Sequence, residues 1–175
     1  ATAVNTLVFE PDETIFGDNT DGVGLVSDLE HNLQRPMRGA RVLIVGAGGA
    51  VHGVLQPLLS AGPMELTIVN RTTERAFTLA ASFASYGSIK ALPLDQLMGQ
   101  SFDLVINGTA ASLVDQVPAL PGNLFAKGAL AYDMAYSVQP TPFMRWASEH
   151  GAENIVDGLG MLVEQAAQSF ELWHG

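Results

Sequence analysis

An apolar run that ends in a cluster of glycines is the feature that most constrains the fold of this chain. Residues 41–45 read Arg-Val-Leu-Ile-Val, and residues 46–50 read Gly-Ala-Gly-Gly-Ala. The run predicts a buried strand, and the glycines that follow it let backbone N–H groups approach a ligand closely. The helix expected next directs the positive end of its dipole to the same place. We therefore predict a strand, a tight turn and a helix that together bind a pyrophosphate.

The tip of the following strand indicates which dinucleotide is bound. In folds that bind NAD, an Asp or Glu at this tip accepts hydrogen bonds from the ribose 2′-hydroxyl. This chain instead has Asn70 and Arg71, and Arg75 lies one helical turn further along. Because two guanidinium groups can face one 2′-phosphate, the pattern predicts NADP as the cofactor.

A purely structural role for the glycines is the alternative. The strict motif G-x-G-x-x-G/A has Gly or Ala at the position of Val51, and the next glycine is Gly53. Many α/β proteins use such turns only to pack a helix closely on a sheet. The pair Asn70-Arg71, at the expected spacing, favours the cofactor site.

Length and composition bound the class of protein. The chain has 175 residues, enough for one domain with a sizeable core and a fragment of another. Its net charge of −10 disfavours nucleic acid and anionic membranes as partners. It has no cysteine, which excludes disulfides and thiolate metal sites, and we predict no metal site. No apolar run reaches the roughly 20 residues of a membrane span and no signal segment is visible, so the cytoplasm is the expected compartment. The sequence gives no prediction of oligomeric state.

Short apolar runs alternate with helical patterns from residue 41 onward. This alternation predicts an α/β fold, a Rossmann-like doubly wound parallel sheet with helices on both faces. We expect strands at 41–45, 65–70, 88–92, 103–107 and 129–133. We expect helices at 49–61, 73–86, 94–98, 142–150 and 158–173, the last with Asp157 as its N-cap.

The first 35 residues do not follow this alternation. We expect a strand at 3–9, a turn at 11–13 and a helix at 22–33, which together resemble the tail of another domain. The predicted division is residues 1–35 as the remnant of a substrate-binding domain with its connecting helix, and 36–157 as the nucleotide-binding domain. Residues 158–175 form a C-terminal helix that returns toward the substrate cleft.

A polar cluster, Gly17-Asp-Asn-Thr-Asp-Gly22, precedes the first expected helix. One interpretation is a solvated turn with a helix cap. The other is that Asp21 acts with a lysine in acid–base chemistry, while Asn19 and Thr20 support the loop. The two lysines of the chain, Lys90 and Lys127, are not placed to meet Asp21, so such a lysine would lie outside this sequence.

Polar residues also follow the fourth and fifth strands, at the carboxyl edge where open α/β sheets bind ligands. Thr109 offers a hydroxyl there, although a simple strand-end turn explains the segment Asn107-Gly108-Thr109 almost as well. Tyr136 is either a ligand contact or a half-buried core residue. Gln165 lies beside an apolar stripe in the last helix, and its amide suits a polyol.

Together these residues resemble the shikimate dehydrogenases, NADP-dependent enzymes of aromatic amino acid biosynthesis that interconvert 3-dehydroshikimate and shikimate. The resemblance rests on five motifs in the family's order, which are Ala3-Val-Asn-Thr6, Gly17-Asp-Asn-Thr-Asp-Gly22, Gly46-Ala-Gly-Gly-Ala50 with Asn70-Arg-Thr72 and Arg75, Asp133-Met-Ala-Tyr136, and Gly158-Leu-Gly-Met-Leu-Val-Glu-Gln165.

The resemblance implies that Asp21 is half of a catalytic Lys–Asp pair, and that Asn5, Asp21, Tyr136 and Gln165 contact the substrate. It also implies that NADP is surrounded by Gly48, Gly49, Ala50, Asn70, Arg71, Thr72, Arg75, Met134 and Gly158. Gly46, Asn107 and Thr109 join the predicted cofactor site because they lie at strand ends.

The chain departs from the family pattern at several points. In the family, a substrate-binding domain that carries the catalytic lysine precedes the position of Ala1, and a final helix follows that of Gly175. Asn107-Gly-Thr109 replaces the usual Asn-Ala-Thr-Ser, and Val51-His52 replaces a small residue followed by Arg or Lys. We therefore expect an NADP-dependent shikimate dehydrogenase in the intact protein, and NADP binding without catalysis by this chain. The alternatives are a quinate/shikimate dehydrogenase and a non-catalytic NADP-binding module.

Overall fold

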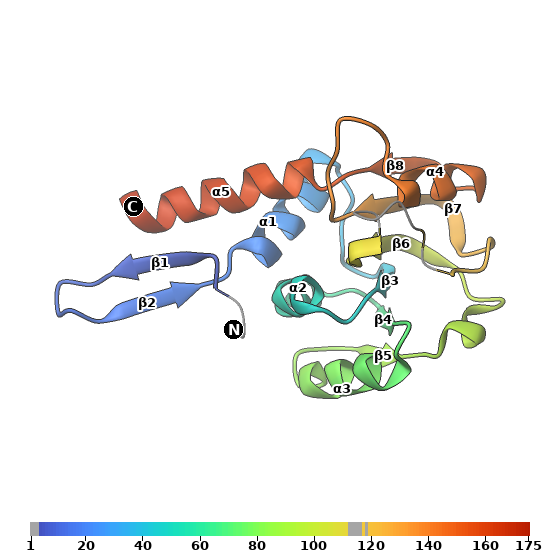
Figure 1. Ribbon diagram of the computed structural model, residues 1–175, viewed down its shortest axis with the longest axis horizontal. Helices are drawn as coiled ribbons and strands as arrows, with labels where there is room; N and C mark the ends of the chain where they lie inside the picture. The colour runs from blue at the N-terminus through green and yellow to red at the C-terminus, as the bar shows by residue number, and fades with distance from the viewer. Residues whose placement is uncertain (1–3, 112–116, 118) are drawn as a thin grey trace.

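A six-stranded parallel sheet forms the centre of the molecule. The computed structural model describes residues 4–111, 117 and 119–175 (Figure 1). The strands are β3 (Arg41–Val45), β4 (Glu65–Val69), β5 (Ile89–Ala91), β6 (Phe102–Asn107), β7 (Phe125–Asp133) and β8 (Asn154–Val156). They lie in the order β5-β4-β3-β6-β7-β8, and every neighbouring pair is parallel. Successive strands are added on one side of β3 up to β5 and on its other side from β6 onward. The switch point of the sheet therefore lies between β3 and β6, where doubly wound folds bind nucleotides.

Helices cover both faces of this sheet, as predicted. Alternate residues of β3 point to opposite sides, with Val42 and Ile44 in one core and Leu43 and Val45 in the other. The first core is closed by α1 (Asp21–Ser27), α2 (Gly49–Ser60) and α3 (Thr73–Phe83). The second is closed by a 3₁₀ turn (Leu94–Leu97) and α4 (Pro142–Glu149). The predicted Rossmann-like fold class is confirmed.

A separate two-stranded hairpin precedes α1. Its strands, β1 (Thr6–Phe9) and β2 (Ile15–Asp18), are antiparallel and pair with each other. The last helix, α5 (Leu159–His174), runs back from the sheet alongside α1 and the hairpin (Figure 1). Near its end the Trp173 indole donates a hydrogen bond to the Leu7 carbonyl oxygen, at 2.9 Å. Segments from both ends of the sequence thus form one layer beside the sheet.

Several element predictions were wrong in detail. Strands β2 and β8 were not predicted, because each is short and the former was assigned to a loop. The helix expected at 22–33 is α-helical only to Ser27, after which Asp28–Asn32 forms a π-helical turn. The helix expected at 94–98 is a 3₁₀ turn between Pro93 and Gly99, the latter with φ +79°.

Other boundaries shifted by a few residues. The strand expected at 3–9 begins at Thr6, and Ala3 lies outside the described residues. The N-cap of α5 is Gly158 rather than Asp157, although the Asp157 carboxylate accepts a hydrogen bond from the Leu159 N–H at 3.2 Å.

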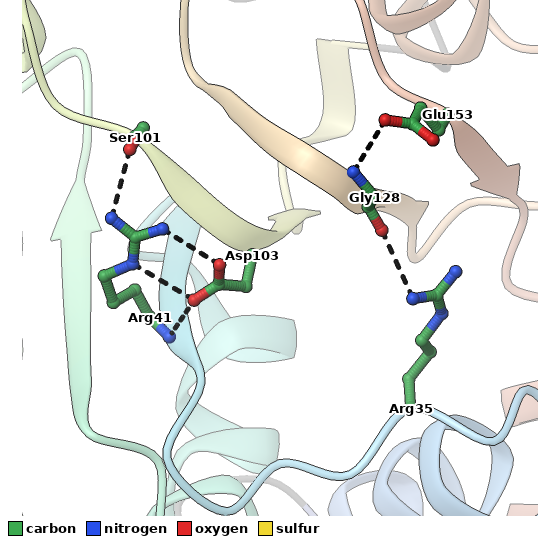
Figure 2. A network of polar contacts seen from close by, with 6 residues as sticks. All are labelled: Arg35, Arg41, Ser101, Asp103, Gly128 and Glu153. Atoms are coloured by element: carbon green, nitrogen blue, oxygen red, sulfur yellow. Dashed lines mark hydrogen bonds and ion pairs between the residues drawn. The ribbon is translucent and has the colours of Figure 1, made fainter.

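The amino edge of the sheet is held by charged groups (Figure 2). The Asp103 carboxylate accepts hydrogen bonds from the Arg41 guanidinium at 2.9 and 3.1 Å and from the Arg41 backbone N–H at 2.8 Å. These bonds lower the pKa of the Asp103 carboxyl below its ordinary value. On the same edge, the Gly128 carbonyl oxygen accepts a hydrogen bond from Arg35, and the Gly128 N–H donates to Glu153. These contacts stabilise the edge opposite to the predicted site.

Glycines let α1 approach its neighbouring helices closely. A Cβ on Gly24 would lie 2.6 Å from the Gln165 backbone nitrogen of α5. A Cβ on Gly22 would lie 2.6 Å from the Pro57 ring of α2. Neither position has room for a side chain, so α1 is held between α2 and α5 at backbone distance.

The packing of α2 on the sheet explains two of the departures from the family pattern. Val51 is fully buried in the first turn of α2. A Cβ on Gly108, which follows β6, would lie 2.4 Å from the Cγ2 methyl of Val51. The larger side chain at position 51 therefore occupies the space that an alanine at position 108 would need. The two departures compensate each other.

This interpretation predicts a coupled pair of substitutions. Gly108→Ala overpacks the contact and is expected to lower the free energy of unfolding by about 1–3 kcal/mol. Val51→Ala opens a cavity by itself, but it makes room for the added methyl group in the double variant. The double variant is expected to be more stable than the sum of the single effects by about 0.5–3 kcal/mol, as measured by urea unfolding.

The matched control pairs Gly108→Ala with Val54→Ala, a buried valine further along α2. This second pair is expected to be additive. Additivity in the Val51 pair as well would contradict the compensation.

Candidate functional site

The glycine turn after β3 leaves open space at the start of α2. Gly46 has φ +118°, a conformation that favours glycine. A Cβ built on Gly48 or Gly49 would meet no atom within 4 Å, and both residues are exposed, as is Ala50. The first N–H groups of a helix have no partner within the helix, so this turn presents donors and a positive dipole to the open space.

The loop after β4 carries the two predicted arginines. The Asn70 side chain donates a hydrogen bond to the Thr72 carbonyl oxygen at 2.9 Å, which fixes the turn into α3. Arg71 and Arg75 flank the N-cap Thr72, and both are exposed. The two guanidinium groups therefore lie at the carboxyl edge of β4, the strand next to the glycine turn.

The ends of β6 and β7 are joined by buried polar groups. Asn107 and Asp133 are both fully buried, and the Asn107 amide donates to the Asp133 carboxylate at 3.0 Å. The Thr141 hydroxyl donates to the same carboxylate at 2.5 Å. The Asn107 side-chain oxygen accepts a bond from the Thr109 hydroxyl at 2.8 Å. Asn107 thus lies below the surface, and Thr109 is the residue of this pair that is nearer to solvent.

Met134 lies between two glycines at the end of β7. A Cβ on Gly158 would lie 2.3 Å from the Met134 carbonyl oxygen, and a Cβ on Gly108 would lie 3.1 Å from its sulfur. Tyr136, two residues later, is 55% exposed, so the interpretation of Tyr136 as a half-buried core residue was wrong. The segment that follows β7 therefore has a close-packed beginning and an exposed tyrosine.

A second cluster brings together the predicted substrate residues from three elements. The Asn5 amide, just before β1, donates to the Asp21 carboxylate at 2.8 Å and lies 3.5 Å from the Gln165 side-chain oxygen. The Thr20 hydroxyl lies 3.2 Å from both the Asn5 and the Gln165 side-chain oxygens. Asn5, Asp21 and Gln165 are therefore neighbours, although up to 160 residues separate them in sequence.

Two hydroxyls beneath this cluster were missed by sequence reasoning. The Ser169 hydroxyl lies 2.7 Å from that of Thr6 and 3.1 Å from that of Thr20, and all three residues are buried. The Thr6 hydroxyl in turn donates to the Asn5 side-chain oxygen at 3.0 Å. The available signal was that Ser169 lies one helical turn after Gln165, on the same face of α5.

The solvated-turn interpretation of residues 17–22 was partly right. The Asn19 side-chain oxygen accepts a bond from the Asp21 N–H at 3.0 Å, as an Asx turn does. Thr20 is the N-cap of α1, but its side chain makes no capping bond and faces the cluster instead. Of the two lysines, Lys90 pairs with Glu65 at 2.5 Å, and Lys127 lies early in β7, toward the amino edge.

Other features of the described residues do not point to a second functional site. A groove of about 690 Å³ lies between α1, α2 and α5, and none of the predicted site residues lines it. Among the described residues, no group of three or more His, Asp or Glu side chains could hold a metal ion. In the same part of the chain, no helix is both long and apolar enough to cross a membrane.

Comparison with known proteins gives consistent matches. The family model described as shikimate / quinate 5-dehydrogenase matches residues 28–115, and the model of the shikimate 5'-dehydrogenase C-terminal domain matches residues 158–175. A shikimate dehydrogenase (NADP(+)) from Aromatoleum aromaticum is 55% identical over all of this chain. The alignment covers 63% of that relative's length, so the chain spans less than two thirds of it.

Solved structures agree over nearly the whole chain. An Ael1 enzyme from Pseudomonas putida superposes with a TM-score of 0.91 and 46% identity, covering 99% of this chain and 63% of that one. A shikimate 5-dehydrogenase from Thermus thermophilus, in complex with NADP(H) and shikimate, has a TM-score of 0.82 and 34% identity, with coverage of 99% and 62%. With the glycine turn, the arginine pair and the Asn5–Asp21–Gln165 cluster all in one fold, this chain belongs to the shikimate/quinate 5-dehydrogenase family.

Proposed function

We propose that this chain is the NADP-binding part of an NADP-dependent shikimate dehydrogenase. The observation that carries the proposal is the open space at Gly48 and Gly49, next to a strand tip with two exposed arginines and no acidic residue at positions 70–73. The similar Aromatoleum protein is named for NADP(+), and the Thermus structure contains NADP(H) and shikimate.

On the basis of the sheet order, we propose that the two halves of the cofactor lie on opposite sides of the glycine turn. Arg71 and Arg75 follow β4, on one side of β3, and suit the 2′-phosphate. Thr109, Met134 and Gly158 follow β6, β7 and β8, on the other side, and suit the nicotinamide. The pyrophosphate then lies against the N-terminus of α2, where Gly48 and Gly49 leave room for it.

The second cluster suits a substrate with several hydroxyl groups. Asp21 and Gln165 contribute side-chain oxygens, which accept hydrogen bonds, and the hydroxyls of Thr6, Thr20 and Ser169 hold Asn5 and Gln165 in place from below. Shikimate and 3-dehydroshikimate offer hydroxyl donors to such acceptors. Tyr136 is exposed and extends the proposed substrate site from the end of β7.

The reaction moves a hydride and a proton. Bound NADP⁺ would supply the acceptor for the hydride that leaves the carbon bearing the reacting hydroxyl. Asp21 stays fixed by the Asn5 amide and takes part in transfer of the hydroxyl proton together with a lysine. Lys90 and Lys127 are engaged or located elsewhere, so we propose that the lysine belongs to a part of the protein outside this sequence.

The same geometry supports the domain division expected from the sequence. We propose that residues 1–35 are the remnant of the substrate domain with its connecting helix and that residues 158–175 return toward the substrate cleft, because the hairpin and α5 pack together beside the sheet while α1 also closes its first core. Exposed side chains on this layer include Phe9, Ile15, Phe170 and Trp173. A substrate domain of the kind expected in the longer relatives would cover them. We also propose a cytoplasmic location.

Two alternatives to an NADP-dependent shikimate dehydrogenase make different use of the two clusters of residues. A quinate/shikimate dehydrogenase would use the same cluster with a broader choice of substrate, and Arg71 with Arg75 argues against its NAD-using forms. A non-catalytic NADP-binding module would use the glycine turn and the arginines, but not Asp21.

The cofactor proposal predicts a charge-dependent preference. The chain is expected to bind NADPH more tightly than NADH in a calorimetric titration, and Arg71→Ala is expected to reduce the difference about 10- to 100-fold. The physical reason is the loss of a charge-assisted hydrogen bond to the 2′-phosphate. NADH affinity is expected to change by less than twofold.

Arg38→Ala is the matched control, because Arg38 is also exposed but precedes β3, at the amino edge. Its NADPH affinity is expected to equal that of the parent chain. If the folded parent chain binds neither nucleotide, the cofactor proposal is wrong.

The reaction proposal predicts a loss of turnover in the protein that contains this chain. Asp21→Asn is expected to lower kcat for shikimate-dependent NADP reduction by about 10²–10⁴-fold, with NADPH affinity unchanged, because the proton-transfer partner is removed. Asp18→Asn, a neighbouring carboxylate in β2, is expected to stay within a few fold of the parent. Equal kcat values for Asp21→Asn and the parent would exclude the role, and turnover by the isolated chain would show that the lysine is not required.

A further inference from the structure

A buried carboxylate lies where three site-bearing elements meet. Asp28 is 4% exposed, and its Oδ2 accepts a hydrogen bond from the Tyr132 hydroxyl at 2.7 Å. Its Oδ1 accepts a bond from the Asn32 amide at 3.0 Å. Neither ion pair found among the described residues involves Asp28. Because burial of a carboxylate is unfavourable, an apolar pair would fill this space at a lower free-energy cost.

The third element at this point is the first turn of α5. A Cβ on Gly160 would lie 2.1 to 2.4 Å from the atoms of the Asp28 carboxyl group, so the carboxylate rests directly against the α5 backbone. Tyr132, which donates to Asp28, is fully buried.

Each of these elements carries a residue of the proposed site. Tyr132 precedes Met134 by two positions at the end of β7, and Gly158 packs against Met134. Asp28 directly follows α1, which begins at Asp21. The π-helical turn begins at this same residue, and such turns are frequent at functional sites. A shift in the Asp28–Tyr132 bond would move the nicotinamide side of the cofactor site relative to Asp21.

We infer that Asp28 and Tyr132 are positioning residues, which hold the β7 end and the first turn of α5 in the arrangement that receives the nicotinamide half of NADP. Burial and the bond to Asp28 raise the pKa of the Tyr132 hydroxyl well above its ordinary value, so the donor stays protonated at all physiological pH values. The inference rests on the proposed function, because it assigns a role within the proposed cofactor site.

The test compares a complete cofactor with half of one. NADPH contains the nicotinamide, whereas 2′,5′-ADP carries only the adenine half with its 2′-phosphate. Tyr132→Phe is expected to weaken NADPH binding about fivefold while the affinity for 2′,5′-ADP stays within twofold, as measured by calorimetry on the folded variant. Tyr86→Phe is the matched control, since Tyr86 is 48% exposed, and both affinities are expected to be unchanged.

A second measurement uses the parent chain and does not depend on the folding of a variant. Coupling between two sites is reciprocal, so NADPH is expected to slow hydrogen exchange at the Met161 N–H, while 2′,5′-ADP is not. Two results would overturn the positioning role: an equal loss of affinity for NADPH and 2′,5′-ADP in Tyr132→Phe, or equal slowing of exchange at the Met161 N–H by the two ligands. A merely structural contact would not distinguish a ligand with the nicotinamide from one without it. Failure of the parent chain to bind NADPH would overturn the proposed function and this inference together.

Discussion

The contact between α1 and α5 is the constraint on which the rest of the site depends. Gly24 has no side chain, and the α5 backbone at Gln165 occupies the space where a Cβ would lie. This approach brings Gln165 within reach of Thr20 and Asn5, and it seats Asp28 against Gly160 further along the same pair of helices. A side chain at position 24 would separate the helices and would break both sets of contacts.

The carboxyl edge of the sheet shows how one fold accommodates departures from a motif. Val51 stands where the nucleotide-binding pattern has Gly or Ala, yet α2 still packs closely on β6, because Gly108 removes the competing side chain. The glycines that face the proposed pyrophosphate, Gly48 and Gly49, are not involved in this exchange. Packing and ligand approach are thus carried by different residues of the same turn, which is why the departure does not argue against a cofactor site.

Sequence reasoning predicted the parallel sheet well, because β3, β4 and β6 are short segments that are mostly apolar and buried on both faces. It missed β2 and the π-helical turn at Asp28, since neither has a periodic signal of its own. Asp21 and Gln165 were candidates from their local sequence, whereas Asn5 was named only through the family resemblance. The hydroxyls of Thr6 and Ser169 could not be placed, because their contact joins residues 163 positions apart and depends on the helix packing.

We propose above that NADP binds across the glycine turn at the carboxyl edge of this sheet. The most direct test is to add NADP⁺ to isotope-labelled protein and to follow the backbone amide resonances by NMR. We expect shifts at Gly48 and Gly49, at Arg71 and on the Met134–Gly158 side, with none at the amino edge around Asp103. Shifts confined to the amino edge or to the groove between α1, α2 and α5, or no shifts at saturating cofactor, would contradict it.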